Sequence, residues 1–412
     1  MKAFGPAHQN QTIRRLVESG IRVSDLPTPV LTLDATAVEH NIGVMGSFTA
    51  VHGVDLAPHG KTTMAPALWR RQLEAGAWAI TVATPWQLRV AHVAGIKRII
   101  HAGAVLSKSD LLDIAHRRSS DPELEVYVWA DSAQTVMLMA AAYPETAPRL
   151  QILVEGGAPG ARTGARTVAQ CLAAAQIVAD ARTLQLCGVT AWEGSLRGAR
   201  APGGRALVAA FCDGIAECYE AIANDGLLSE TEDPVISAGG SSFFDVVVDR
   251  WLPRLAGTPH SPRIVLRSGC YLTHDDGLYQ QSSPFSDVDG PRLSPALNVW
   301  AQVVSRPESG LAFLNAGRRD APYDGTLPIP QQILGRDEAA SSLALAGAKV
   351  AQLNDQHAYL ELSESSDLRL GDTIRCGISH PCTAFDKWAV IPIVDDARSE
   401  NPRLVGAVRT IF

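Results

Sequence analysis

Short apolar runs alternate with longer amphipathic segments over residues 54–269 of the 412-residue chain. The apolar runs are rich in Val, Ile and Leu without polar alternation, a pattern typical of strands buried on both faces, as in a parallel sheet. They occupy residues 54–57, 78–83, 98–103, 124–130, 150–156, 184–192, 234–239 and 263–269. Helical segments lie between them, among others at residues 64–76, 131–143, 167–181 and 206–226. Eight strand–helix repeats in roughly 215 residues predict an α/β fold, a closed (β/α)8 TIM barrel, with a doubly wound open sheet as the rival.

The pattern changes after about residue 285, where short β-prone segments are separated by Gly, Pro and Asp turns. These segments predict a mostly antiparallel β domain. They cover residues 296–307, 310–317, 349–363, 372–379, 387–396 and 403–412. An earlier strand-like run at residues 29–34 can join this domain. We therefore predict a barrel over residues 36–275 and a β domain formed by residues 1–35 together with 276–412.

Composition and charge exclude several classes of partner. The chain is 46% hydrophobic and 19% charged, with a net charge of −7. A negative balance without a dense Lys/Arg run argues against a nucleic-acid or anionic-membrane partner. The seven cysteines form no C-x-x-C pair, and an odd number suits a reducing compartment. Because the N-terminus lacks an apolar signal region and no apolar run reaches about 18 residues, we expect a cytoplasmic protein.

The stretch "PHGKTT" places Lys61 just after the first barrel strand. Gly-Lys-Thr also ends a phosphate-binding loop, which requires a glycine five residues before the second glycine. Asp55 occupies that position, and Pro58 removes one of the backbone N–H groups that such a loop needs. A nucleotide-binding role for Lys61 is therefore excluded by the spacing.

Two glycine-rich loops follow the seventh and eighth strands, where barrels often bind phosphate. The first contains Gly239, Gly240 and Ser241, and the second contains Gly269, Cys270 and Tyr271. Glycines allow close backbone approach, and hydroxyl groups add donors. A lysine that faces a phosphate site across a barrel mouth is the arrangement of a pyridoxal phosphate enzyme.

Several motifs resemble one family in order and spacing. They are "TPVLTLD", "PHGKTT", "GARTG", "ISAGGS", "RSGCY", "LNAGRRD", "DGTLP" and "SHPCTAFDKW", which span residues 28–388. Together they resemble the fold-type III pyridoxal phosphate enzymes, with an alanine-racemase-like barrel, of the D-serine dehydratase and D-threonine aldolase family. Within it the chain is most similar to the bacterial cryptic D-serine deaminases.

The resemblance implies roles for three residues and an oligomeric state. Lys61 is expected to bind the cofactor covalently and to remove the Cα proton of the substrate. His59 is expected to pack near the cofactor, or only to brace its loop. Arg162 in "GARTG" is expected to contact the cofactor or orient a substrate carboxylate, or else to form an ion pair at the rim. A homodimer is also implied.

His380 and Cys382 in "SHPCTAFD" are the predicted metal ligands. Two residues apart on an extended strand, they would face one side and reach one ion. Imidazole and thiolate suit zinc best, with Mn or Mg as alternatives. The resemblance supports the site, because the dehydratases of this family carry His-x-Cys whereas the aldolases tend to carry His-x-Asp. Asp386 is a conceivable extra ligand, or an ordinary surface residue. Tyr323 and Asp324 can reach the active site from the second domain, or Asp324 and the following glycine simply form a turn.

We therefore predict a pyridoxal phosphate- and divalent metal-dependent dehydratase that eliminates water from D-3-hydroxy amino acids such as D-serine or D-threonine. The products would be a 2-oxoacid and ammonia. Alternatives are retro-aldol cleavage of the D-threonine aldolase type and a 3-hydroxyaspartate dehydratase or aldolase. Racemisation needs no metal, so the His-x-Cys pair would then lack a purpose. The non-catalytic pyridoxal phosphate-binding proteins are usually single barrels, so the extra β domain and the metal pair argue against them.

Overall fold

The computed structural model describes residues 2–5, 8, 11–196, 201–228, 230–231, 233–258, 260–286 and 290–412. The chain forms two compact units. One contains residues 46–61 and 69–269, and the other contains residues 1–45, 62–68 and 270–412. Two of the passages between the units fall within helices, α2 (Ala35–His52) and α3 (Pro66–Glu74).

The first unit holds eight parallel strands in the order β2-β9-β8-β7-β6-β5-β4-β3. Their bounds are β2 Asp55–Leu56, β3 Ile80–Val82, β4 Arg98–His101, β5 Glu125–Ala130, β6 Leu150–Gly156, β7 Leu184–Ala191, β8 Val235–Ala238 and β9 Arg263–Leu266. The two ends of this order also meet, because Trp78 N donates to Leu56 O at 2.7 Å and Thr81 N donates to Pro58 O at 2.9 Å. The sheet is therefore closed, and the predicted (β/α)8 barrel is confirmed over an open sheet.

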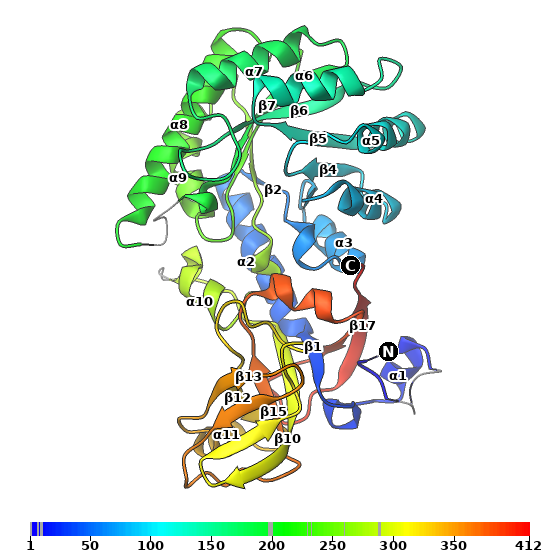
Figure 1. The fold of residues 1–412 in the computed structure, drawn as a ribbon, viewed down its shortest axis with the longest axis vertical. Coiled ribbons are helices and arrows are strands. Elements are labelled where there is room, and N and C mark those ends of the chain that lie inside the picture. Colours follow the sequence, from blue (N-terminus) through cyan, green and yellow to red (C-terminus); the bar gives the residue numbers. More distant parts are fainter. Residues whose placement is uncertain are drawn as a thin grey trace. The chain divides into compact units, whose positions relative to one another are not determined.

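Helices follow these strands on the outside of the barrel (Figure 1). In addition to α3 they are α4 Pro85–Val93, α5 Lys108–Ser120, α6 Ala133–Ala142, α7 Val168–Asp180, α8 Gly204–Asn224 and α9 Phe244–Leu255. Four of them begin at a Ser or Thr whose side chain accepts a backbone N–H of the first turn, namely Thr84, Ser107, Ser132 and Thr167. Such N-caps stabilise a helix start by about 1 kcal/mol each, and they end the loops that carry the barrel's chemistry.

The barrel interior is packed rather than hollow at its centre. Each strand or its flanking residues supply buried side chains to one cluster, which consists of Ala57, Ala79, Ile100, Tyr127, Trp129, Leu153, Cys187, Val235 and Val265. Close packing of this kind is typical of small barrels.

The second unit contains a sheet of nine strands, counted over the described residues, that is mostly antiparallel as predicted. The strands are β1 Val30–Asp34, β10 Leu297–Glu308, β11 Leu311–Leu314, β12 Ile329–Ile333, β13 Lys349–Leu353, β14 Ala358–Glu361, β15 Thr373–Gly377, β16 Val390–Val394 and β17 Leu404–Arg409. The early strand β1 joins this sheet between β10 and β16, pairing antiparallel with the former and parallel with the latter. The apolar pattern does not predict strand β12, because "IPQQI" has only two apolar side chains besides proline. Three short helices complete the unit: α1 Ile13–Glu18, α10 Leu278–Ser282 and α11 Glu338–Ala344.

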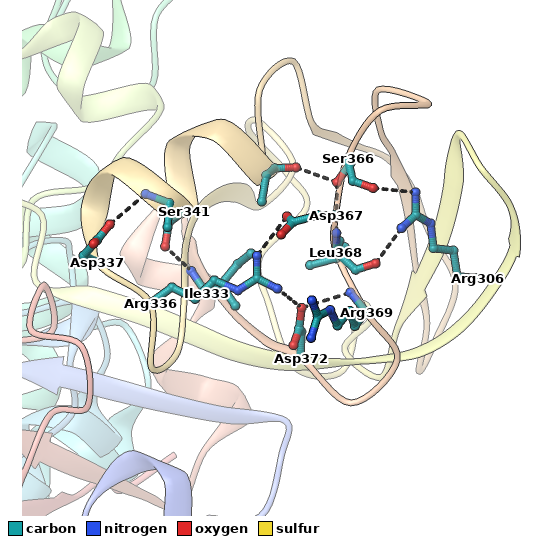
Figure 2. Close-up of polar contacts among 12 residues, drawn as sticks. Arg306, Ile333, Arg336, Asp337, Ser341, Ser366, Asp367, Leu368, Arg369 and Asp372 are labelled. Atoms are coloured by element: carbon teal, nitrogen blue, oxygen red, sulfur yellow. Dashed lines mark hydrogen bonds and ion pairs between the residues drawn. The ribbon is translucent and has the colours of Figure 1, made fainter.

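An arginine network fixes the loop that precedes β15. Figure 2 shows Arg336 between two carboxylates, Asp367 at 2.9 Å and Asp372 at 2.8 Å. Arg306 donates to the carbonyl oxygens of Leu368 (2.5 Å) and Ser366 (3.0 Å) in the same loop. The loop is therefore held by two guanidinium groups, which define where β15 and the predicted metal segment after it begin.

Gly188 in β7 gives a test of the barrel geometry. Its φ is +140°, and a Cβ there would lie 1.9 Å from Val235 O in the neighbouring strand. Gly188→Ala should therefore lower the free energy of unfolding by about 3 kcal/mol or more. Gly214→Ala is the matched control, since Gly214 is in α8 and no neighbouring atom of the described residues lies within 4 Å of the position that its Cβ would take. That change should stabilise by about 0.5–1 kcal/mol. Equal denaturant midpoints for the two variants would contradict the register of β7 and β8.

Candidate active site

The strand register brings the predicted cofactor loops side by side. Leu56 at the end of β2 pairs with Leu266 at the end of β9, which in turn pairs with Ala238 at the end of β8. The loops that carry Lys61, residues 239–241 and Gly269 therefore leave the barrel at one level, from neighbouring strands.

Lys61 lies on a short 3-10 turn, Gly60–Thr62, directly after β2. Its side chain is exposed, and it makes no hydrogen bond or ion pair within the described part of the chain. The preceding His59 has a pKa well below its usual value, mainly because it is buried and further because Lys61, Arg267 and Arg162 are positive. The imidazole is therefore neutral near pH 7, so it adds no positive charge beside the lysine.

The glycines after β8 direct their N–H groups at a carboxylate. Gly240 N donates to Glu193 Oε1 at 2.6 Å, and Gly239 N donates to Glu193 Oε2 at 3.2 Å. Gly239 has φ +78°, and a Cβ there would lie 2.6 Å from Leu266 Cδ2, so the turn requires glycine. Glu193 is fully buried, and burial raises the pKa of its carboxyl group. These two N–H groups, predicted to bind a phosphate, thus already have an acceptor within the chain.

The remaining predicted cofactor residues belong to both units. A Cβ at Gly269 would lie 2.8 Å from both the Cβ and the O of His59, so the two loops are in direct contact. Ser241 is half-buried, whereas Tyr271 is buried in the second unit. Arg162 is exposed after β6, and its guanidinium lies 4.7 Å from the ring centroid of Trp192. This stacking holds Arg162 against the residue that precedes Glu193.

Arg267, the residue after β9 and the first residue of the "RSGCY" motif, is a buried cation to which the sequence analysis assigned no role. Its guanidinium donates to Ser237 Oγ and Ala191 O, both at 2.5 Å, and lies 4.7 Å from the Trp129 ring centroid. Burial lowers its pKa to about 10. A charged residue between an apolar strand and a glycine, "RIVLRSG", is the signal that would have pointed to it.

In addition to Glu193, Glu155 is a buried carboxylate, and the sequence analysis did not identify it. It is the penultimate residue of β6, is 4% exposed, and accepts a hydrogen bond from Thr163 Oγ1 at 2.7 Å. Burial raises the pKa of its carboxyl group. The charges of Glu155 and Glu193 both favour the protonated form of Arg267. The strand ends therefore combine one buried cation with two buried carboxyl groups whose pKa values are raised.

Buried polar atoms without hydrogen-bond partners support a pyridoxal phosphate site in the barrel, independently of the sequence motifs. Four buried polar atoms near the strand ends have no hydrogen-bond partner among the described residues: His59 Nδ1, His101 Nε2, Trp129 Nε1 and Arg267 Nε. An unsatisfied buried polar group costs about 1–3 kcal/mol, so native structures leave few of them. These atoms, the amine of Lys61 and the glycine turns are the groups that a polar, phosphorylated ring would need.

The expectation of an extended strand at residues 380–382 is wrong. β15 ends at Gly377, His380 has a left-handed backbone (φ +60°), and Pro381–Thr383 form a 3-10 turn. Proline at the first position of such a turn is favourable because its φ is already helical. The tight turn, rather than strand alternation, brings the two side chains together, since His380 and Cys382 are hydrogen-bonded to each other.

Cys382 lies in a cluster of polar groups within the second unit. Its Sγ is 3.2 Å from Thr62 Oγ1 and 3.9 Å from Cys270 Sγ. The hydrogen bond with Cys270 is the main cause that lowers the pKa of the Cys382 thiol well below its usual value. The hydrogen bond with Cys382 raises the pKa of His380 to about 9. Both shifts favour a thiolate at Cys382 beside a protonated His380. The Cys270 side chain, predicted at the phosphate site, contacts the sulfur of Cys382.

The donor set of this pair suits a divalent ion. An imidazole nitrogen and a thiolate sulfur share a proton here, and an ion that prefers N and S ligands, such as zinc, can take its place. No group of three or more His, Cys, Asp or Glu side chains is arranged to hold a metal in the ranges that the structure describes. The pair therefore offers two candidate ligands, and an ion bound by two protein ligands would keep open positions.

Comparison with known proteins identifies similar sequences. Residues 296–394 match the family model described as a putative serine dehydratase domain. The chain is 24% identical to a D-threonine aldolase of Arthrobacter sp over 388 residues, which cover 93% of each chain. It is also 24% identical to a 3-hydroxy-D-aspartate aldolase of Paracoccus denitrificans (strain Pd 1222) over 381 residues, 90% of each chain.

Solved structures share the two-unit fold. The D-threonine aldolase from Filomicrobium marinum matches with a TM-score of 0.78 at 24% identity, covering 95% of this chain and 97% of that one. The D-threo-3-hydroxyaspartate dehydratase from Delftia sp. HT23 matches with a TM-score of 0.73 at 21% identity, covering 94% and 98%. Within the described residues, none of the helices combines the length and apolar character needed to cross a membrane.

The thiolate at Cys382 makes a prediction about reactivity. In chelator-treated protein, the rate of alkylation of Cys382 by iodoacetamide should change less than about 2-fold between pH 6.5 and 8.5, because the thiolate already predominates. A thiol of ordinary pKa would react about 50-fold faster at the higher pH. Mass spectrometry of the peptide that contains residue 382 gives the rate, with Cys382→Ala confirming the assignment. A rise of about 50-fold would show that no thiolate is stabilised there.

Proposed function

Because the chain belongs to the fold-type III pyridoxal phosphate family of D-serine dehydratases and D-threonine aldolases, we propose that it is a metal-dependent dehydratase of D-3-hydroxy amino acids. The substrates would be D-serine, D-threonine or a related amino acid, and the products a 2-oxoacid and ammonia. The observation that carries this choice is the pairing of His380 with a cysteine, Cys382, which resembles the His-x-Cys pair of the family's dehydratases rather than the His-x-Asp pair of its aldolases.

The barrel residues have separate tasks in this proposal. Lys61 binds the cofactor through its amine and then removes the Cα proton of the substrate. The cofactor, when bound, supplies an electron sink that acidifies this proton. Neutral His59 lines the loop without adding charge, while Arg267 presents a buried positive charge to the cofactor and the N–H groups near Gly269 receive the phosphate.

The second unit supplies the group that assists loss of the β-hydroxyl. His380 and Cys382 would hold a divalent ion, with zinc the best suited, and such an ion would supply Lewis acidity that makes the β-hydroxyl a better leaving group. Cys270 and Thr62 hold the sulfur of Cys382 in place through their contacts with it. By resemblance to fold-type III enzymes, we expect the protein to act as a homodimer.

Retro-aldol cleavage is the second candidate, and the similarity to two aldolases favours it. It requires removal of the proton from the β-hydroxyl rather than departure of hydroxide. It would convert D-threonine to glycine and acetaldehyde, or 3-hydroxy-D-aspartate to glycine and glyoxylate. The two reactions therefore differ in every product.

Product analysis tests the proposed function directly. The purified enzyme loaded with pyridoxal phosphate and Zn²⁺ should release equal amounts of 2-oxoacid and ammonia from D-serine or D-threonine. Removal of the metal by a chelator should slow the reaction at least about 100-fold, since Lewis-acid stabilisation contributes several kcal/mol. Glycine and aldehyde instead of oxoacid and ammonia would establish the aldolase reaction, and elimination at full rate in chelator would exclude the role of the metal.

Lys61 provides a separate test of cofactor attachment. The pyridoxal phosphate-loaded protein should absorb near the edge of the visible range, and borohydride reduction should fix the cofactor to the peptide that contains Lys61. Lys61→Ala should lose this covalent label and at least about 10³-fold in turnover. Lys108→Ala, an exposed lysine at the start of α5, is the matched control and should retain both. A covalent label that persists in Lys61→Ala would assign the attachment to another residue.

A further inference from the structure

The carboxylate of Asp324 contacts the imidazole of the predicted metal ligand His380. Asp324 Oδ2 lies 2.5 Å from His380 Nδ1, and Asp324 Oδ1 accepts a hydrogen bond from Thr383 Oγ1 at 2.8 Å. An ionised carboxylate only accepts hydrogen bonds, so His380 Nδ1 must carry a proton to donate. Nε2 is then the ring nitrogen that remains for an ion.

The backbone around His380 is held by the same unit. His380 has φ +60°, a left-handed conformation that is unfavourable for a residue other than glycine. Its N–H donates to Asp275 Oδ2 at 3.3 Å, and Thr326 N donates to Ser379 Oγ at 3.2 Å. A Cβ at Gly325 would lie 2.3 Å from Ser379 Oγ, so the turn that contains Asp324 packs directly against the residue before His380. The turn and the ligand segment are thus fixed to each other.

We propose that Asp324 is a positioning residue of the metal site, which fixes the tautomer and ring orientation of His380 so that Nε2 faces the ion. This inference rests on the metal site proposed above. Carboxylates that accept from the distal N–H of a ligating histidine commonly strengthen metal binding about 10- to 100-fold. A turn residue with no such role would also explain an Asp-Gly pair, but it would not need both carboxylate oxygens engaged on the metal segment.

Asp386 offers a matched comparison in the same stretch of chain. It lies in the short 3-10 turn Phe385–Lys387, four residues after Cys382, and its side chain is exposed. The described residues show no hydrogen bond between Asp386 and either predicted ligand. Its removal changes the local charge as much as removal of Asp324 does, without touching the imidazole.

Metal affinity of the full-length variants tests the proposal without reference to turnover. Zn²⁺ affinity is measured by competition with a chromophoric chelator, and Co²⁺ binding by the thiolate-to-cobalt charge-transfer absorption. Asp324→Asn and Asp324→Ala should weaken binding of both ions about 10- to 100-fold, whereas Asp386→Asn should change it less than about 2-fold. Thr383→Val, which frees one oxygen of Asp324, should show a smaller loss than Asp324→Asn. Unfolding temperatures of the metal-free variants separate lost affinity from lost folding, and the isosteric Asn variant remains informative if the Ala variant does not fold.

The outcomes distinguish this inference from the site on which it rests. If Cys382→Ala abolishes the Co²⁺ absorption but Asp324→Asn binds like the unmodified protein, the metal site stands and the role of Asp324 is overturned. An equal loss in Asp324→Asn and Asp386→Asn would also overturn it, because the effect would then be one of charge alone. If His380→Ala and Cys382→Ala both bind like the unmodified protein, the proposed metal site fails and the inference fails with it.

Discussion

The in-register parallel pairing of β2, β9 and β8 is the constraint from which the barrel site follows. Backbone hydrogen bonds align Leu56, Leu266 and Ala238 at one level, so three loops separated by some 180 residues of chain begin side by side. Nothing in the loops themselves brings them together. Their residues can therefore be chosen for chemistry, with glycine where the backbone must come close and lysine where a reactive amine must be exposed.

Burial of charge is the second organising element of the barrel end. Three ionisable residues lie at strand ends whose surroundings are otherwise apolar: Arg267, Glu155 and Glu193. Burial lowers the pKa of Arg267 and raises the pKa of both glutamates, so it favours the neutral form of each group. Buried ionisable groups are tolerated only where hydrogen bonds or opposite charges compensate them. Here the compensation is incomplete, because Arg267 Nε has no partner among the described residues. Incomplete compensation of this kind is expected where a ligand supplies the missing contacts.

The fold could be predicted from the sequence because it depends on repeated signals. Val-, Ile- and Leu-rich runs marked all eight barrel strands, and the run at residues 29–34 correctly joined the second sheet. The polar strand β12 could not be found, because it lies where pairing with β15 outweighs its weak local preference. At the site, Lys61 and the glycine loops carry local motifs, whereas Glu155 and Arg267 matter through burial, which a single sequence does not report. The geometry at His380 could not be predicted either, since a left-handed residue before proline is decided by tertiary contacts rather than by spacing.

The left-handed backbone at His380 has a consequence for how this site can diversify. Its conformation, its N–H bond to Asp275 and its ring bond to Asp324 constrain residue 380 at three points. Residue 382 follows in an ordinary 3-10 turn, and its sulfur contacts Thr62 and Cys270. Exchange of the soft sulfur at that position for a hard carboxylate oxygen would alter which ions the site prefers while leaving the imidazole in place. A single substitution at residue 382 could therefore change the metal preference, whereas residue 380 is too constrained to be exchanged.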